Sequence, residues 1–231
     1  MHNRLFTGIN NVTDYISVPP YLYRYEDDIF IDQFFETGQL MISCFKQYKS
    51  YKDNELGDSS EGLTANFGFT ENQKTIVTVT GVGFNTYCFC TSTLLDSNIK
   101  TAFKRNSVFR IKDPINFMIE IGRTIPRVTN GLSGNCIYLN NKMIKRHIPA
   151  IEINDFKTAG DENISFEKMM SATEPMHGPE QFFIKKMSYQ HQCEYRMLWN
   201  TDREVNDKLV LNCPEAVKYC ERLTEEDFLI G

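Results

Sequence analysis

The chain has 231 residues, of which 41% are apolar, 24% charged and 13% aromatic, and its formal charge is −5. This composition is typical of a folded globular protein, and it excludes disordered and fibrous chains. The negative charge excludes a protein that coats nucleic acid through overall basicity, but it allows a local basic groove. The sequence has no run of 18 apolar residues, so we expect no membrane span.

The start of the chain and its cysteines indicate a cytoplasmic protein. Residues Met1–Phe6 lack the long apolar segment of a signal peptide. The seven cysteines form no CxxC pair, and the closest two are Cys88 and Cys90. Their side chains point the same way if this segment is a strand. We therefore expect buried, reduced thiols and no zinc site.

The first third of the chain predicts a strand, a helix and a second strand. The first strand covers residues 21–25 and follows two prolines that hold the chain extended. The helix begins at Asp27 and Asp28 and runs through Thr37, with Gly38 as its C-cap. Its buried side is expected to consist of Ile29, Ile31, Phe34 and Phe35. A strand over residues 40–45 and a polar loop over 46–66 follow.

The rest of the chain predicts further short elements. Residues 75–82 and 86–91 are expected to pair as a hairpin. Helices follow over 94–105 and 114–121, with strands over 107–111 and 134–139. Residues 154–179 form a surface excursion, and the last elements are strands over 182–187, 194–199 and 208–211 and a helix over 214–223. The total is about eight strands and four or five helices in a single α+β domain spanning residues 1–231.

Three short motifs carry side chains suited to one reaction. They are Tyr23-Arg24 with Ser43 on the next strand, Thr91-Ser92-Thr93 where a central strand ends, and Gln192-x-Glu194. An arginine on a strand can pair with a pyrophosphate, and a hydroxyl can orient that arginine or a ribose. A carboxylate can stabilise the positive charge on a ribose as its glycosidic bond breaks. Such a set could cleave the nicotinamide–ribose bond of NAD and transfer ADP-ribose.

The geometry of the third motif depends on its secondary structure. On a strand, Gln192 and Glu194 share one face while Cys193 faces away. Residues 189–193 lack alternation, so a helix end is the alternative.

Together the motifs resemble the Arg–Ser–Glu form of the ADP-ribosyltransferase superfamily, over a frame from about Tyr21 to Trp199. Ser43-x-Phe45-Lys46, Gly57-Asp58-x-x-Glu61-Gly62, Phe183-x-Lys185 and Glu194-x-Arg196 also resemble bacterial proteins linked to phage defence. The resemblance implies an α+β domain with a split, mostly antiparallel mixed β core flanked by helices. It also implies NAD as a substrate, without a metal.

The resemblance implies a role for each motif. Glu194 would be the catalytic glutamate, and Gln192 would orient the acceptor or attacking group. The residues that bind NAD would be Tyr23, Arg24, Ser43, Thr91, Ser92 and Thr93. Ser92 corresponds to the hydroxyl of the middle motif, but this chain has Thr-Ser-Thr where the family has Ser-Thr-Ser, so the assignment among the three stays open.

The remaining implications concern partners. Asp58 and Glu61 would lie in a loop that contacts the acceptor. RNA or DNA is slightly favoured over protein as that acceptor, because aromatic side chains and lysine or arginine pairs suit unstacked bases. The chain would then be a toxin or an anti-phage effector, with an antitoxin or chaperone as a further partner.

Each motif also has a structural interpretation. Arg24 between two tyrosines fits an arginine stacked on aromatic rings. Glu194 and Arg196 fit an ion pair on an edge strand. The hydroxyls of residues 91–93 fit an ordinary strand end. On these interpretations the chain is a non-catalytic binding protein that contacts a partner through its aromatic surface.

Four carboxylates in the polar loop leave further alternatives open, and they are Asp53, Glu55, Asp58 and Glu61. Their spacing fails the EF-hand pattern. A solvated loop, a loop that closes over cofactor or acceptor, and a magnesium-dependent nuclease site are the three interpretations. The nuclease is the least favoured, because no strand-borne carboxylate with a downstream lysine accompanies the cluster.

Overall fold

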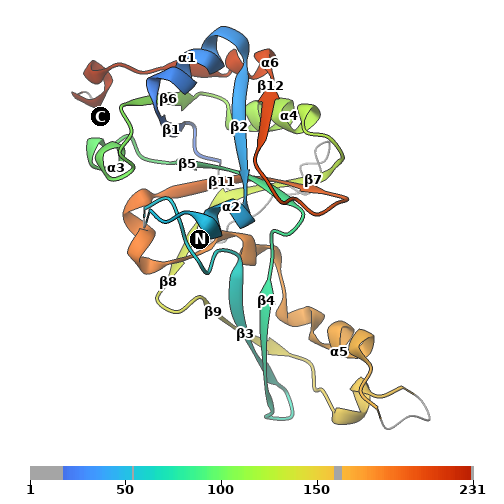
Figure 1. Ribbon diagram of the computed structural model, residues 1–231. Coiled ribbons are helices and arrows are strands. Elements are labelled where there is room, and N and C mark those ends of the chain that lie inside the picture. The colour runs from blue at the N-terminus through green and yellow to red at the C-terminus, as the bar shows by residue number, and fades with distance from the viewer. Residues whose placement is uncertain (1–17, 54, 159–162, 230–231) are drawn as a thin grey trace.

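A computed structural model describes residues 18–53, 55–158 and 163–229 (Figure 1). The expectation drawn from Met1–Phe6 lies outside the described residues. Within these ranges, the helices are all too short or too polar to cross a membrane.

Most strands belong to one large antiparallel sheet. Among the described residues it contains eight strands, which are β1 (Leu22–Glu26), β2 (Gln39–Cys44), β5 (Thr86–Ser92), β6 (Ser107–Ile111), β7 (Val128–Asn135), β11 (Glu194–Thr201), β12 (Leu209–Asn212) and β13 (Cys220–Arg222). The strand order is β12-β2-β5-β1-β6-β13, and β11 pairs with β5 and with β7. The expected mixed architecture with mostly antiparallel strands is therefore confirmed.

The large sheet divides at β5. On one side β5 pairs with β11 along its whole length. Its other neighbours are β2, which pairs at Tyr87 and Cys88, and β1, which pairs at Ser92. β1 and β2 therefore separate beside Cys90, and this split positions the candidate site described below.

Two smaller sheets complete the strands. β3 (Leu63–Thr70) pairs with β4 (Thr75–Gly81) and in parallel with β9 (Met143–Ile148), and β8 (Ile137–Leu139) pairs in parallel with β10 (Ile184–Lys186). Figure 1 shows the three-stranded sheet extending away from the large one. The predicted pairing of 75–82 with 86–91 is wrong, because β4 pairs with β3. Gly83, with φ of 89°, lies against the Phe45 ring at the start of the path to β5.

The helices are short and lie mainly around the large sheet. The α-helices are α1 (Asp28–Thr37), α2 (Phe45–Ser50), α3 (Ser97–Ala102), α4 (Pro114–Thr124), α5 (Phe166–Thr173) and α6 (Pro214–Val217). The 3₁₀ turns are η1 (Ile153–Phe156), η2 (Glu174–Met176), η3 (Pro179–Phe183), η4 (Met187–Gln192) and η5 (Glu225–Leu229). As predicted, Gly38 caps α1 in the left-handed conformation, and its N–H bonds to the Phe34 carbonyl.

Two predicted helices and the expected number of strands are corrected. The helix over 94–105 is only α3, because residues 93–96 follow β5 in an irregular path. The closing helix over 214–223 ends at Val217, and its last part is β13, which pairs with β6. The thirteen strands of the described residues exceed the eight that were expected, because β3, β9 and β13 lie outside the predicted strands and residues 134–139 cover both the end of β7 and β8.

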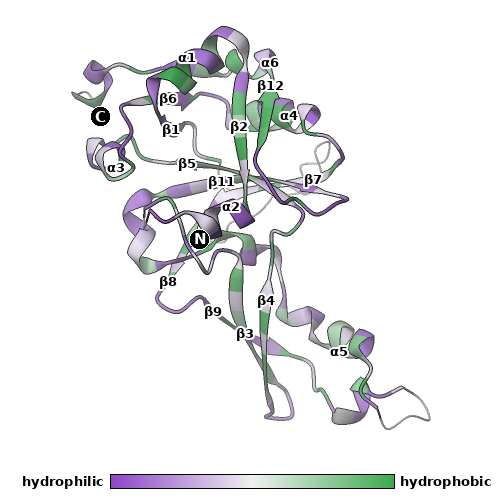
Figure 2. Cartoon of the chain, in the orientation of Figure 1, coloured by the Kyte–Doolittle hydropathy of each residue, from purple (hydrophilic) through white to green (hydrophobic). Residues whose placement is uncertain are grey.

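The core lies between the large sheet and helices α1, α4 and α6. Phe34 of α1 stacks on Phe109 of β6 with ring centroids 5.2 Å apart, and Trp199 of β11 is fully buried and donates its indole N–H to the Met118 carbonyl. Figure 2 shows hydrophobic residues along α1, α4, β2 and β12. The prediction for the α1 face is corrected at Ile29, which is 66% exposed.

The predicted polar loop over 46–66 is partly regular. α2 extends to Ser50 and β3 begins at Leu63, so only residues 51–62 form the connecting segment between them. The excursion over 154–179 contains η1, α5 and η2, and most of its side chains are exposed. Met176 is an exception, because it is buried against Ile148.

Candidate functional site

A cleft opens beside Cys90 of β5, between the position where β2 pairs with β5 and the position where β1 does. Its walls come from β1, β2 and β5, from the connecting segment 51–62, and from the stretch between Lys185 and Arg196. The empty space inside is about 830 Å³ when the part open to solvent is included. The part that can hold the centre of a water-sized sphere is about 90 Å³, smaller than the roughly 300–1,000 Å³ of typical ligand pockets.

The structure brings nearly all of the predicted site residues to this cleft. Those that line it are Tyr23, Arg24, Ser43, Asp58, Glu61, Thr91, Ser92, Gln192 and Glu194. Sheet register explains the convergence, because Ser92 pairs with Tyr23 of β1 and also with Glu194 of β11. Thr93 is the exception, since it is not among the lining residues and its hydroxyl donates to the Cys193 carbonyl at 3.3 Å.

Arg24 fills the gap between the separating strands. Its Nη1 donates to the Cys90 carbonyl at 2.8 Å, and its Nη2 donates to a Glu26 oxygen at 2.7 Å. The guanidinium also lies 4.9 Å from the centre of the Phe89 ring, so the predicted aromatic stacking exists, although on a phenylalanine. Burial acts to lower the pKa of Arg24, but the charge of Glu26, its hydrogen bond and the neighbouring Tyr48 and Cys90 together raise it. The side chain keeps 19% of its surface exposed.

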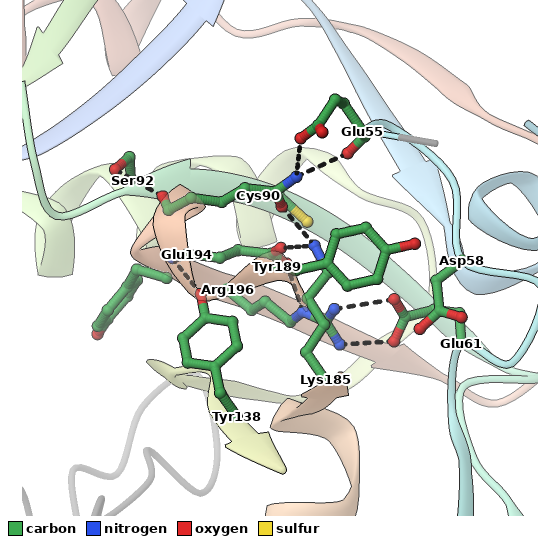
Figure 3. A network of polar contacts seen from close by, with 12 residues as sticks. Glu55, Asp58, Glu61, Cys90, Ser92, Tyr138, Lys185, Tyr189, Glu194 and Arg196 are labelled. Carbon is green, nitrogen blue, oxygen red and sulfur yellow. Dashed lines mark hydrogen bonds and ion pairs between the residues drawn. The ribbon is translucent and has the colours of Figure 1, made fainter. Parts of the chain in front are cut away.

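Glu194 lies in a buried chain of alternating charges (Figure 3). One carboxylate oxygen accepts from Nε of Arg196 at 2.6 Å, and the other binds Nζ of Lys185. Arg196 also binds both oxygens of Glu61, at 2.9 and 3.0 Å. Burial acts to raise the pKa of the Glu194 carboxyl, but the charges of Arg196 and Lys185 outweigh burial and hold it well below its usual range. Glu194 is therefore ionised at neutral pH.

Two sequence interpretations of this region are corrected. Glu194 and Arg196 do form an ion pair, but β11 lies between β5 and β7 and is not an edge strand. Gln192 does not precede Glu194 on a strand either. It ends the 3₁₀ turn η4, and Cys193 is left-handed with φ of 45°, so the helix-end alternative is the correct one.

The hydroxyls of the middle motif join β5 to the start of β11. Ser92 Oγ donates to the Gln192 carbonyl at 2.9 Å and accepts from the Leu94 N–H at 3.1 Å. Thr91 Oγ1 donates to the Tyr195 carbonyl at 3.0 Å. Ser43 is buried on β2, opposite Cys88. The two donor bonds fix the position of the turn before Glu194 relative to the end of β5.

The connecting segment packs across the cleft rather than into solvent. Asp58 and Glu61 are only 3% and 2% exposed, which excludes the solvated-loop interpretation for these two side chains. Asp58 binds Nζ of Lys142 at 2.6 Å. Burial acts to raise the pKa of Asp58, but the bond and charge of Lys142 and two hydrogen bonds from Ser60 together lower it.

Glu55 ties the same segment to the turn before Glu194. Its carbonyl and carboxylate both accept from Nε2 of Gln192, at 2.8 and 3.1 Å. Its carboxylate also contacts the His191 ring at 2.8 Å. The Tyr189 hydroxyl donates to the Gly57 carbonyl at 2.8 Å. The segment therefore borders the cleft, as the sequence predicts.

The four carboxylates of this segment do not converge. Each binds a different cationic or basic side chain, and for Asp53 that partner is Lys104. Over residues 18–53, 55–158 and 163–229, no three His, Cys, Asp or Glu side chains are grouped as metal ligands. The seven cysteines are free thiols, five of them buried, and the sulfurs of Cys88 and Cys90 lie 3.5 Å apart as their spacing predicts.

Several residues of the cleft are absent from the predicted set. Arg105 and Glu26 lie beside Arg24, with 3.0 Å between Nη1 of Arg105 and Oε1 of Glu26. Lys185 and Arg196 hold Glu194. The i, i+2 spacing of Glu194 and Arg196 is the one local signal for this network. Lys185 belongs to the motif Phe183-x-Lys185, but its contact with Glu194 has no local signal, because it reaches Glu194 from another sheet.

Compared with known proteins, the chain matches no family model, no curated protein and no solved structure.

Proposed function

We propose that this chain is a mono-ADP-ribosyltransferase with an ADP-ribosyltransferase-like fold, which cleaves NAD and transfers ADP-ribose to a macromolecule. One observation carries the proposal. Arg24, Ser92 and Glu194 line the same cleft. Ser92 lies 68 positions after Arg24, and Glu194 lies 102 positions after Ser92. The cleft also lies at the split in the large sheet, where a ligand can reach side chains from β1, β5 and β11.

In the proposed reaction, the bond between ribose C1′ and the nicotinamide nitrogen breaks, and nicotinamide leaves with the bonding electrons. Glu194, which is ionised, stabilises the positive charge that develops on the ribose. A nucleophilic oxygen or nitrogen of the acceptor then bonds to C1′ and releases one proton. Arg24, which has exposed surface beside the cleft, binds the pyrophosphate.

For the acceptor, we propose RNA or DNA in preference to protein. Tyr51 lines the cleft and is 37% exposed, which suits stacking against an unpaired base. Lys104 and Lys186 have exposed side chains that suit phosphate contacts. The proposal includes a cytoplasmic toxin or defence effector that an antitoxin or chaperone would control.

A non-catalytic binding protein is the second candidate, and a specific observation favours it. Both oxygens of Glu194 already bind cations of the protein, and Arg24 already binds Glu26. A cleft whose charges are paired internally is also what a stable binding scaffold would have.

The deciding experiment incubates the protein with NAD labelled in its adenine half and with total RNA, DNA or protein, and then separates the fractions. Label in one macromolecular fraction supports the transferase and identifies the acceptor class. Release of free nicotinamide without labelled product means hydrolysis of NAD alone. If neither occurs, the protein is not an ADP-ribosyltransferase and the binding protein is favoured.

A further inference from the structure

Lys185 brings together two side chains that the backbone does not align. In a regular strand, Gln192 and Glu194 would share a face through their i, i+2 spacing. Cys193 interrupts that alternation with its left-handed φ of 45°, a conformation that costs a non-glycine residue free energy. Nevertheless, Nζ of Lys185 donates to Oε1 of Gln192 at 2.7 Å and also binds Oε2 of Glu194 (Figure 3).

We propose that Lys185 is a positioning residue of the candidate site, which holds Gln192 and Glu194 toward one point and keeps Glu194 oriented for the ribose. The inference rests on the proposed function. Lys185 acts from β10, which belongs to a different sheet from β11. Its ammonium lies 4.7 Å from the centre of the Tyr189 ring, so a neighbouring aromatic group helps to fix it.

The geometry favours positioning over simple charge neutralisation. Arg196 already supplies one positive charge to Glu194 and is itself shared with Glu61. Arg196 touches only Oε1 of Glu194, so without Lys185 the second oxygen of Glu194 would lose its bond. Gln192 would keep the bonds of its Nε2 to Glu55 but lose the bond to its Oε1. Lys185 is 7% exposed and lines the cleft, so its removal would change the site itself.

Several titratable and charged groups face Glu194 from the surrounding elements. They are Lys185 of β10, Arg196 of β11, Glu61 of the connecting segment, Cys88 and Cys90 of β5, Tyr138 of β8, and Cys136 between β7 and β8. Two of these groups are cations. Removing Lys185 therefore leaves the buried Glu194 carboxylate with Arg196 as its one cation. The pKa of Glu194 then rises by about 1–3.

The test compares Lys185→Met with the wild type in NAD cleavage. We expect kcat to fall at least about 10-fold with KM changed less than about 3-fold, because the carboxylate acts after NAD has bound. Lys185→Arg, which restores the charge, should recover part of kcat. Lys218→Met is the control, since Lys218 also binds a carboxylate, that of Glu215, but has a half-exposed side chain and does not line the cleft.

The pH profile gives the readout that a structural role would not move. We expect the acid limb of kcat to lie at a higher pH in Lys185→Met than in the wild type, and kcat is followed to the lowest pH at which both proteins stay folded. An unchanged kcat and an unchanged acid limb would overturn the inference while the transferase stands. If Lys185→Met does not fold, Lys185→Gln, which keeps a hydrogen-bond donor without the charge, takes its place in the same comparison.

Failure of the proposed function gives a different result. Wild-type protein that cleaves no NAD overturns the transferase. The hold of Lys185 on Glu194 is then measured by urea unfolding of wild type and Lys185→Met from about pH 2 to about pH 6, the range in which a carboxyl with a lowered folded pKa becomes protonated. A stability difference between them that shrinks toward the acid end supports the hold, and a difference independent of pH overturns it.

Discussion

Arg196 binds the carboxylate of Glu61 through two parallel hydrogen bonds, although the two residues lie 135 positions apart. The planar guanidinium matches the carboxylate and still presents Nε to Glu194, which a lysine could not do. Both side chains are almost fully buried. This fork therefore fastens the connecting segment to β11 of the large sheet, in the wall of the candidate site.

Glu61→Gln should destabilise the protein by about 3–5 kcal/mol, because it leaves Arg196 buried with an incomplete set of negative partners. Urea unfolding at neutral pH measures this loss. Glu221→Gln is the matched control, since Glu221 binds Arg110 at the surface and is 44% exposed, so its loss should be below about 1 kcal/mol. Similar losses in both variants would show that the buried fork contributes no more than a surface pair.

Glu194→Gln should reduce NAD cleavage by about 10²-fold or more, because it removes the negative charge at the breaking bond while keeping the side chain's shape. The rate is measured at a temperature where circular dichroism shows the variant to be folded, since the substitution also disturbs a buried charge network. A folded variant that cleaves NAD at the wild-type rate would refute the catalytic role of Glu194.

Arg24→Ala should weaken NAD binding by about 10-fold or more, since a charge-assisted contact to the pyrophosphate is lost. Calorimetric titration with NAD measures the affinity, and a melting curve measures stability. Arg110→Ala is the control, because Arg110 lies on the neighbouring strand β6 and also covers an aromatic ring, Tyr21, but does not line the cleft. A large fall in melting temperature with unchanged affinity would mean that Arg24 is structural.

The sequence predicted the site better than it predicted the fold around it. The convergence of Arg24, Ser92 and Glu194 follows from neighbouring strands of one sheet, because Arg24 lies within β1, Ser92 ends β5 and Glu194 begins β11. What it could not reveal is Lys185, whose contact with Glu194 depends on how two separate sheets pack. Short motifs show which side chains are suited to a reaction, but they do not show which side chains from elsewhere in the chain hold them.

The polar loop was predicted poorly because burial there runs against the usual pattern. In β3 the buried positions are polar, and Asn66 donates to the Thr80 hydroxyl at 2.9 Å while Leu63 is exposed. Lys142 begins a short basic run over residues 142–147, a pattern typical of a solvated face, yet its ammonium is buried against Asp58. Hydrogen bonds and ion pairs offset the free-energy cost of burying these polar groups. Neither partner can be identified from its own neighbours in the sequence.

The free energy of unfolding should fall at acid pH, because two buried carboxylates are ionised in the folded protein. The pKa of Glu194 and that of Asp58 are both held below their ordinary values of 4.5 and 3.8. A carboxyl with a depressed pKa in the folded state stabilises the protein above its unfolded pKa, and this stabilisation is lost as pH falls toward the folded pKa. Unfolding free energy should thus be level above about pH 5 and decline below about pH 4.5. Urea unfolding across this range measures it, and a curve that stays level to about pH 3 would refute the assignment.

Asp58→Ala should impair transfer to the macromolecular acceptor more than it impairs hydrolysis of NAD. The substitution removes the bond from Lys142 that holds the middle of the connecting segment, whereas the Arg196–Glu61 fork and the contacts of Glu194 stay in place. We expect transfer to fall about 10-fold and hydrolysis to change less than about 3-fold, because positioning of the second substrate is lost while the NAD site is kept. Asp202→Ala is the control, since Asp202 binds Arg127 at the surface and does not line the cleft, and it should leave both rates unchanged. Both rates are measured in one reaction, as labelled macromolecule and as free ADP-ribose. Equal losses in Asp58→Ala would place the segment at the NAD site, and no loss in either rate would show that the segment does not contact the acceptor.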